Sequence, residues 1–309
     1  MIKKIPFDSH EEWLKIRHQY IGGSDAGAVM GMNPYSSPYA VWAEKTGKIS
    51  GFEGSTITKV GAYLEDLVAQ MFMEETGKKV QRCNFTLVND KYPWACANVD
   101  RMLVGEDAVL EIKTTNSFVN VKKFRQGDYP EQWYCQMMHY LAVTEKKKAY
   151  LAVLSECKEF RIFELERDEA EIDALMSAEK TFWDKVTNNT PPDVDGSEAT
   201  SDAISEIYGK SNGNGIDLMG FESLFEQRKQ ADEAVKQAKE WKDGIDNQIK
   251  SAMGAAERAA CGKYSVSWKE QKRTSFDYKA FRAANPNINV GPYVSESTSR
   301  VFRVTEKRG

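Results

Sequence analysis

Residues 94–115 read WACANVDRMLVGEDAVLEIKTT, and this stretch decides both the fold and the chemistry that the chain can support. Its two apolar-rich parts, residues 94–103 and 109–114, are typical of β-strands. Asp100 lies near the end of the first part. Glu111 and Lys113 stand two residues apart in the second, so both side chains point to the same face of a strand.

Two carboxylates beside a lysine have the chemistry of a metal-dependent nuclease. Carboxylates can converge on a hard cation that stabilises charge on an attacked phosphate, and a lysine can orient the attacking water or help to deprotonate it. A Glu-x-Lys triplet alone is weak evidence, because alternating charges on the solvent face of a strand are more common. Here Val109, Leu110 and Ile112 make the strand apolar, which disfavours exposure of both charges.

The elements predicted around this stretch indicate an α/β fold. Residues 58–76 place Leu64, Val68 and Phe72 on one stripe and stop at Gly77, as an amphipathic core helix does. Further strands are predicted at residues 80–88, 149–154 and 160–166, and further helices at about 131–143 and from Asp168 onward. Helices and mostly antiparallel strands in this order predict a central mixed sheet flanked by helices.

Three shorter helices are predicted near the N-terminus. Asp8 or Ser9 can cap the first, Ser24 the second, and Ser37 followed by Pro38 the third, because their side-chain oxygens satisfy free backbone N–H groups. At the other end of the chain the composition changes. Pro, Asp, Ser, Gly and Asn accumulate after residue 188, which indicates a linker.

The chain is therefore expected to have a nuclease domain, a linker and a C-terminal extension. The extension should begin with a long helix or helical hairpin and end in a small α+β part. The helix is expected from Glu-, Lys-, Gln- and Ala-rich composition, and the strands from the runs KYSVSWKE and SRVFRV. The expected boundaries are residues 1–188, 189–215 and 216–309, with the helical region at 221–260.

Composition indicates which metal ions the chain can bind and where in the cell it is expected. Five scattered cysteines and three histidines form no disulfide or zinc pattern, so carboxylates are the expected ligands and Mg²⁺ or Mn²⁺ the expected ions. No run of eighteen apolar residues or signal peptide is present, which predicts a cytoplasmic protein without membrane contact. The net charge is −4, yet residues 263–309 hold ten basic and four acidic side chains. This basic segment is compatible with DNA binding or with an ordinary solvated surface.

Three further residues occur in the order that such a site would use. Glu65 follows Leu64 at the edge of the apolar stripe, where it could lean toward the same metal, although a surface glutamate is the commoner interpretation. Gln136 and Tyr140 are one helical turn apart, so both could face the site. A buried hydrogen-bonded pair without a functional role is the alternative for these two.

Taken together, these motifs resemble a known family. Glu65, Asp100, Glu111-x-Lys113 and Gln136-xxx-Tyr140 resemble the RecB-like branch of the PD-(D/E)xK nuclease superfamily, which has a restriction-endonuclease-like fold. The segment IGGSDAGAVMGMNPYSSPYAVWAEKTG, residues 21–47, resembles the opening of the YqaJ-like viral recombinase family, relatives of phage lambda exonuclease. The resemblance covers about residues 17–140. The extension has no counterpart in the compact lambda enzyme.

The resemblance implies roles for individual residues. Asp100, Glu111 and the backbone carbonyl of Ile112 would hold the metal, with Glu65 assisting. Lys113 would position the attacking water with help from Gln136, and Tyr140 would support this set. An arginine and a serine seven residues apart bind the 5′-phosphate in lambda exonuclease, and Arg17 and Ser24 have that spacing. Without the family, Arg17 is a surface charge and Ser24 a helix cap.

The sequence therefore predicts a Mg²⁺-dependent exonuclease, encoded by a phage or prophage and acting in the bacterial cytoplasm. It should digest ends of linear double-stranded DNA from 5′ to 3′ and leave 3′ single strands for recombination by annealing. A single-strand annealing recombinase is the expected partner, and the resemblance implies a ring-shaped homotrimer. Two alternatives stay open: an endonuclease or opposite-polarity nuclease of the same superfamily, and a non-catalytic DNA-binding phage accessory protein. The extension could grip duplex DNA or contact a partner protein.

Overall fold

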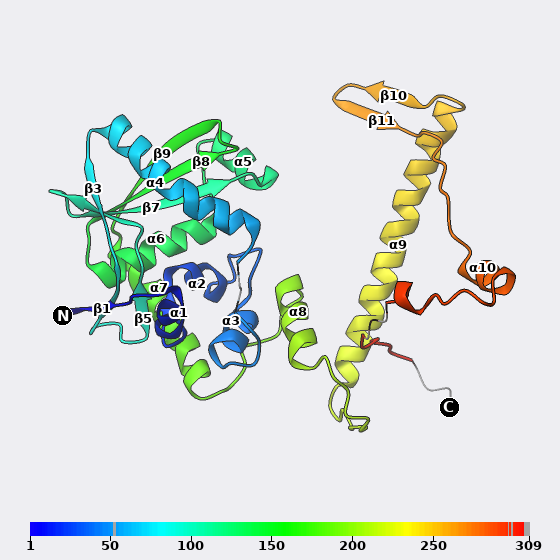
Figure 1. The fold of residues 1–309 in the computed structure, drawn as a ribbon, viewed down its shortest axis with the longest axis horizontal. Coiled ribbons are helices and arrows are strands. Elements are labelled where there is room, and N and C mark those ends of the chain that lie inside the picture. Colours follow the sequence, from blue (N-terminus) through cyan, green and yellow to red (C-terminus); the bar gives the residue numbers. More distant parts are fainter. Residues whose placement is uncertain (52–53, 296, 298, 306–309) are drawn as a thin grey trace. The chain divides into compact units, whose positions relative to one another are not determined.

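In the computed structural model the chain divides into two compact units, Met1–Gly209 and Lys210–Gly309 (Figure 1). The structure describes residues 1–51, 54–295, 297 and 299–305. Lys307 and Arg308, which contribute to the expected basic segment, lie outside these residues. None of the helices in the described ranges combines the length and the apolar composition needed to cross a bilayer.

A mixed five-stranded sheet forms the centre of the first unit, as the sequence predicts. Its strand order is β3-β6-β7-β8-β9, and only β7 and β8 run parallel among the pairs of this sheet. The chain can return from β7 to a parallel β8 because helices α5 and α6 form the crossover. The strands span Lys79–Arg82, Arg101–Val104, Ala108–Thr115, Lys148–Ser155 and Glu159–Glu166 in that order.

Two helices cover the opposite faces of this sheet. Helix α4 (Thr56–Thr76) packs Val68 and Phe72 against the face of β7 that carries Leu110 and Ile112. Helix α6 (Glu131–Thr144) covers the other face, which carries Val109. Because side chains alternate along a strand, Glu111 and Lys113 belong to the face beneath α6. The α4 helix ends at Gly77 in the left-handed conformation, with φ of 67°.

The two strand-like runs at residues 80–88 and 94–103 are each broken in two, which the sequence did not predict. The first run gives β3 and β4 (Phe85–Asn89), and the second gives β5 (Ala95–Ala97) and β6. The halves enter different sheets, since β4 and β5 join β1 (Ile2–Pro6) and β2 (Ile21–Gly22) in the order β1-β4-β5-β2. Asp100 therefore lies where the chain crosses between two sheets.

The N-terminal helices are α1 (His10–His18), α2 (Gly23–Val29) and α3 (Pro38–Lys45). Ser9 caps α1 and Ser37 caps α3, as expected. The expectation for Ser24 was wrong, because Gly22 is the N-cap of α2 and Ser24 lies in its first turn. The Ser24 hydroxyl is therefore available to a neighbour outside the helix.

Helix α2 approaches α6 closely because glycines face it. A Cβ atom on Gly27 would lie 2.6 Å from Cβ of Gln132, and one on Gly23 would overlap the ring of Tyr140. Such separations are too short for real carbon contacts. The glycines of the segment IGGSDAG thus hold the N-terminal segment against the helix that carries Gln136 and Tyr140.

A buried histidine and glutamate join three elements behind the sheet. His139 of α6 and Glu179 of α7 (Glu169–Thr187) are both fully buried, with Nδ1 and Oε1 2.7 Å apart. His139 Nε2 lies 2.8 Å from the carbonyl oxygen of Cys96 in β5. Burial alone would lower the pKa of His139, but the Glu179 carboxylate outweighs it, so the pKa is raised. This pair fixes the strand that leads into Asp100.

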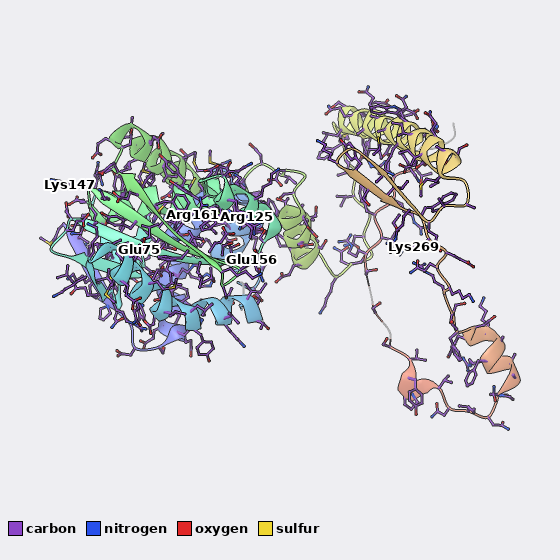
Figure 2. All side chains as sticks on the ribbon, turned by 90° about the horizontal axis from the view of Figure 1, so that it is seen from above. Glu75, Arg125, Lys147, Glu156, Arg161 and Lys269 are labelled. Carbon is purple, nitrogen blue, oxygen red and sulfur yellow. The ribbon has the colours of Figure 1, made fainter. Side chains whose placement is uncertain are left out.

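Two helices of the first unit were not predicted. Helix α5 (Phe118–Arg125) is tied to the β8–β9 turn, since Arg125 lies 3.2 Å from both Glu156 and Glu159 (Figure 2). Helix α8 (Glu198–Ile207) falls inside the segment expected as a linker. It packs on the first unit through Ala203 and through a 2.7 Å hydrogen bond from Thr200 to Ser37.

The second unit begins with one long helix, α9 (Glu222–Met253), rather than a helical hairpin. A β-hairpin of β10 (Arg258–Cys261) and β11 (Tyr264–Ser267) follows, and then α10 (Tyr278–Ala284) and a 3-10 turn at Gly291–Tyr293. Residues 299–304, expected as a strand, are irregular in the described structure. A strand needs a neighbour for its backbone groups, and β10 and β11 pair with each other.

Candidate active site

Asp100 and Glu111 meet where the central sheet opens. Strands β6 and β7 pair only at Arg101 with Leu110 and at Met102 with Val109. Extending this antiparallel register by one residue sets Asp100 opposite Glu111. In place of a strand partner, the carboxylate of Asp100 accepts a 2.7 Å hydrogen bond from the backbone N–H of Ile112. The Asp100 side chain therefore takes the place of a backbone hydrogen bond next to Glu111.

Glu111 is almost fully buried and has one oxygen satisfied and one open. Its Oε1 lies 2.6 Å from Nζ of Lys113 and accepts a 2.7 Å hydrogen bond from the Gln136 amide. Its Oε2 is buried and, within the described part of the chain, has no hydrogen-bond partner. A buried carboxylate oxygen without a partner is unfavourable unless another group binds it.

Gln136 and Tyr140 form a supporting layer above Glu111. The Gln136 amide nitrogen, which contacts Glu111, is also 2.9 Å from the Tyr140 hydroxyl. Tyr140 in turn donates a 2.8 Å hydrogen bond to the carbonyl oxygen of Asn98. The structure thus brings five of the candidate residues into one network, namely Asp100, Glu111, Lys113, Gln136 and Tyr140.

The electrostatics of this network favour an added cation. Burial, together with the nearby Glu111 carboxylate, raises the pKa of Asp100 well above its usual range, and Lys113 only partly opposes this. For Lys113, burial lowers the pKa, but Glu111 and Asp100 outweigh it and raise the pKa overall, so this amine stays charged. Two carboxylates share one ammonium group, and a divalent ion would remove the imbalance.

The residues fit a hard divalent ion. Oxygen atoms are the ligands that Mg²⁺ prefers, and the open Oε2 of Glu111 lies on the residue next to Asp100 across the sheet opening. Glu65 reaches the site from α4: it pairs with Arg101, whose guanidinium also donates a 2.6 Å hydrogen bond to the carbonyl oxygen of Asp100, and its charge helps to raise the pKa of Asp100. Arg101 also contacts Asp66 at 2.7 Å. Among the described residues, no three acidic, histidine or cysteine side chains converge as they stand.

A second charged cluster lies in the N-terminal segment. The Arg17 guanidinium contacts the Ser24 hydroxyl and the Asp25 carboxylate, each at 2.9 Å. The other oxygen of Asp25 lies 2.8 Å from Nζ of Lys45, whose side chain is fully buried, and 3.0 Å from the N–H of Gly22. Burial alone would raise the pKa of Asp25, but Lys45 and Arg17 outweigh it and hold the pKa well below its usual range.

One cation of this cluster is open to solvent. Arg17 and Lys45 both contact the carboxylate of Asp25, the Glu44 carboxylate also acts on Arg17, and the Arg17 side chain is 26% exposed. An anion could therefore reach Arg17 and Ser24 from solvent. Neither Asp25 nor Lys45 was predicted from the sequence. The only local signal was a charged residue within the otherwise small-residue run IGGSDAGA. Packing of Gly23 on Tyr140 connects the cluster to the carboxylate network.

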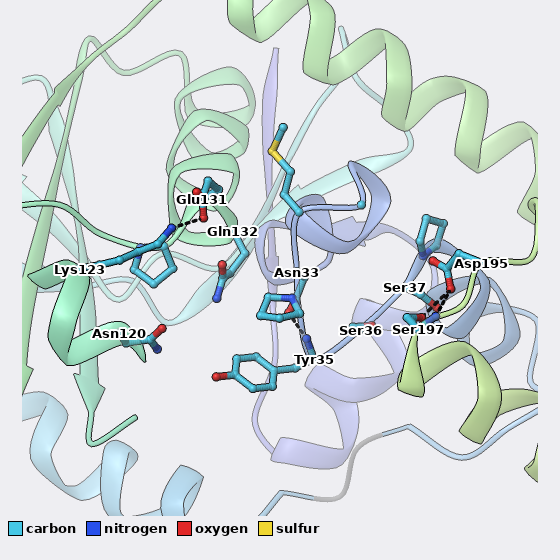
Figure 3. Close-up of a pocket in the computed structure, with 15 residues that line it drawn as sticks. Asn33, Tyr35, Ser36, Ser37, Asn120, Lys123, Glu131, Gln132, Asp195 and Ser197 are labelled. Carbon is cyan, nitrogen blue, oxygen red and sulfur yellow. Dashed lines mark hydrogen bonds and ion pairs between the residues drawn. The ribbon is translucent and has the colours of Figure 1, made fainter. Parts of the chain in front are cut away.

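A hollow of about 490 Å³ lies beside the start of α6 (Figure 3). The loop carrying Asn33 and Tyr35, the α5 residues Asn120 and Lys123, and Gln132 of α6 line it. Lys123 is paired with Glu131 at 2.6 Å. The hollow contains none of the candidate metal ligands, so it is a different feature from the carboxylate network.

The fold has counterparts among solved structures. The chain matches the crystal structure of an alkaline exonuclease (LHK-Exo) from Laribacter hongkongensis with a TM-score of 0.51 and 19% identity, over 58% of this chain and 94% of that chain. The complex of LHK-Exo with dAMP matches with the same TM-score and coverage at 18% identity. The first unit therefore shares the fold of this alkaline exonuclease.

Sequence comparisons identify the family. Residues 12–147 match the YqaJ-like viral recombinase domain. Over 290 residues the chain is 38% identical to the uncharacterized protein YqaJ of Bacillus subtilis, covering 91% of this chain and 89% of that protein. A 45-residue stretch is 40% identical to protein D345L of African swine fever virus, covering 15% of this chain and 13% of that protein. The chain belongs to the YqaJ-like viral recombinase family.

The carboxylate pair predicts how stability depends on pH and on metal. Because the pKa of Asp100 is raised in the folded state, the free energy of unfolding falls as the pH rises from the ordinary carboxyl pKa through the raised value. At neutral pH with EDTA, Asp100→Asn should therefore raise the melting temperature, since the amide oxygen can still accept the Ile112 N–H. Mg²⁺ should raise the melting temperature of the wild type and leave that of Asp100→Asn unchanged.

Differential scanning calorimetry with EDTA and with Mg²⁺ measures both effects. Asp107→Asn is the matched control, because Asp107 is 48% exposed and paired with Lys146 outside the network. An equal response of wild type and Asp100→Asn to Mg²⁺ would contradict the assignment of a metal site here.

Proposed function

We propose that this chain is a Mg²⁺-dependent exonuclease that hydrolyses phosphodiester bonds at the ends of linear double-stranded DNA. The observation that carries the proposal is the network of Asp100, Glu111, Lys113 and Gln136, with one buried Glu111 oxygen left open. Membership in a viral recombinase family and a fold shared with alkaline exonucleases support it. The dAMP bound to LHK-Exo supports a DNA substrate, since such a nucleotide is a product of DNA hydrolysis.

The residues of the network would divide the chemistry. Asp100 and Glu111 would hold the ion together with the backbone carbonyl of Ile112, and Glu65 would assist after exchanging its contact with Arg101. When bound, the ion supplies positive charge to the attacked phosphate and lowers the pKa of a bound water. Lys113, held charged beside Glu111, would orient the attacking water. Gln136, held in place by Tyr140, would form a second hydrogen bond with this water and so fix the direction of its attack.

The N-terminal cluster would recognise the 5′-phosphate at the end of the strand. The Arg17 guanidinium and the Ser24 hydroxyl already point to one another, and both can bond phosphate oxygens. Lys45 and Asp25 would hold Arg17 in place from within the protein. Recognition of a 5′-phosphate favours digestion from 5′ to 3′, which leaves a 3′ single strand. A single-strand annealing recombinase would use that strand, and a homotrimer around the DNA is proposed from the family resemblance.

The first test is removal of the charges in the network. Lys113→Ala and Glu111→Ala should each lower the rate of hydrolysis by a factor of about 10² to 10³ or more, because a fixed charge beside the reacting phosphate is lost. Both variants should stay folded and bind DNA ends. Release of nucleotides from a labelled linear duplex measures the rate. Lys148→Ala is the control, since Lys148 lies on neighbouring β8 and pairs with Glu164 and Glu166. Near wild-type rates in either network variant would remove the active-site assignment.

The second test concerns the end of the DNA. Arg17→Ala should slow digestion of 5′-phosphorylated duplex far more than digestion of 5′-hydroxyl duplex, because a charge-assisted contact is lost only where the phosphate exists. Initial rates on the two substrates measure this ratio. Lys15→Ala is the matched control, since Lys15 lies on the same helix and contacts exposed Glu11. An equal effect of Arg17→Ala on both ends would make Arg17 a structural or general DNA-backbone residue.

A further inference from the structure

The β-hairpin of the second unit has one apolar face. The cross-strand pairs are Cys261 with Tyr264 and Ala259 with Val266, so these four side chains share a face. Trp268 continues the same alternation, and its backbone N–H donates a 2.9 Å hydrogen bond to the carbonyl oxygen of Glu257, which extends the ladder and sets the Glu257 side chain opposite Trp268 at the end of this face. Two aromatic rings, of Tyr264 and Trp268, therefore stand on one side of a short two-stranded ribbon.

These rings are exposed. Tyr264 is 66% exposed and Trp268 is 48% exposed, and Phe276 in the following segment is 71% exposed. A two-stranded ribbon cannot cover its own apolar face, so such rings normally gain stability from a further contact. Isolated exposed aromatic residues need no explanation, but here they recur within one short segment.

The same segment is basic. Residues 263–282 contain six basic and only two acidic side chains, interleaved with five aromatic ones. Lys263 lies with its Nζ 5.5 Å from the centre of the Tyr264 ring, and Lys269 directly follows Trp268 (Figure 2). Lys263 therefore lies beside the Tyr264 ring, and Lys269 is the next residue after Trp268 in the sequence. We call Tyr264, Trp268, Lys263 and Lys269 the hairpin surface.

We propose that the hairpin surface binds single-stranded DNA. Unpaired bases would stack on the rings of Tyr264 and Trp268, while Lys263 and Lys269 would contact the phosphates. Duplex DNA fits this surface less well, because its bases already stack on each other and would leave both rings exposed. A basic surface also disfavours a basic protein partner. This proposal rests on the proposed function in one respect: the exonuclease would generate the single strand that the hairpin surface binds.

Binding can be measured without any nuclease activity. The full-length chain carrying Asp100→Asn, kept in EDTA, is titrated into a fluorescein-labelled oligothymidylate that has no 5′-phosphate, and separately into a blunt duplex. Tyr264→Ala and Trp268→Ala should each weaken binding to the single strand by about 5- to 100-fold, as expected when one stacked base is lost. Duplex binding should change by less than about twofold.

Three further variants separate stacking from folding and from charge. Tyr264→Phe and Trp268→Phe keep an aromatic ring and should retain most of the affinity. Lys269→Glu should weaken binding and lower the salt dependence, by about 0.7 in the log–log slope for one lost phosphate contact on a single strand. Trp241→Ala is the matched control, because Trp241 is 73% exposed on α9 and lies outside the hairpin surface.

The outcomes separate this proposal from the proposed function. Unchanged single-strand affinity in Tyr264→Ala and Trp268→Ala overturns it, and so does an equal loss for duplex and single strand, which would indicate a duplex grip. If Tyr264→Ala and Trp268→Ala instead lose binding to an annealing protein while their DNA affinity is unchanged, the hairpin is a protein-docking surface and the proposal is overturned. If these rings bind single strands but the wild-type chain hydrolyses no DNA with Mg²⁺, the present proposal stands and the proposed exonuclease activity is rejected.

Discussion

The hydrogen bond from the Ile112 N–H to the Asp100 carboxylate is the interaction on which the rest of the site depends. It replaces one rung of the β6–β7 ladder with an acidic side chain and thereby sets that side chain next to Glu111. Carboxylates in such proximity repel each other, and burial raises the cost of ionising both. The surrounding structure maintains this arrangement through Lys113, Gln136 and the packing of α6, and a divalent ion would complete it.

The first unit contains two charged clusters of opposite character. The Asp100 and Glu111 carboxylates have one ammonium group beside them, that of Lys113, whereas the Arg17 and Lys45 cations both contact one carboxylate, that of Asp25. One cluster is suited to a cation and the other to an anion. Helix α2 packs closely on α6 because Gly23 and Gly27 have no side chains, and this packing fixes the position of one cluster relative to the other. The proposed exonuclease would need both functions within one rigid frame.

Local pattern was sufficient for much of the fold and for the carboxylate network. Helix α4, helix α6 and strand β7 have strong periodicity, and Glu111 and Lys113 follow from the alternation along β7. The division of residues 94–103 between two sheets was not predictable, because each half is apolar and only long-range pairing assigns it. The Asp25–Lys45 pair was missed for the same reason, since no local period relates residues twenty positions apart. Glu65 was expected near the metal, and the structure places it close enough to Asp100 to act on its pKa; its pairing with Arg101 was not predicted, because that contact depends on tertiary packing.

The most direct test of the account compares substrates that differ only in their ends. Linear duplex DNA labelled at the 5′ or the 3′ terminus, and a covalently closed circle, are incubated with the full chain in Mg²⁺ and in EDTA. The account predicts that with Mg²⁺ the 5′ label is released first as a mononucleotide, that the 3′ label persists, and that the circle stays intact, with no reaction in EDTA. Cleavage of the circle, early release of the 3′ label, or hydrolysis in EDTA would contradict it.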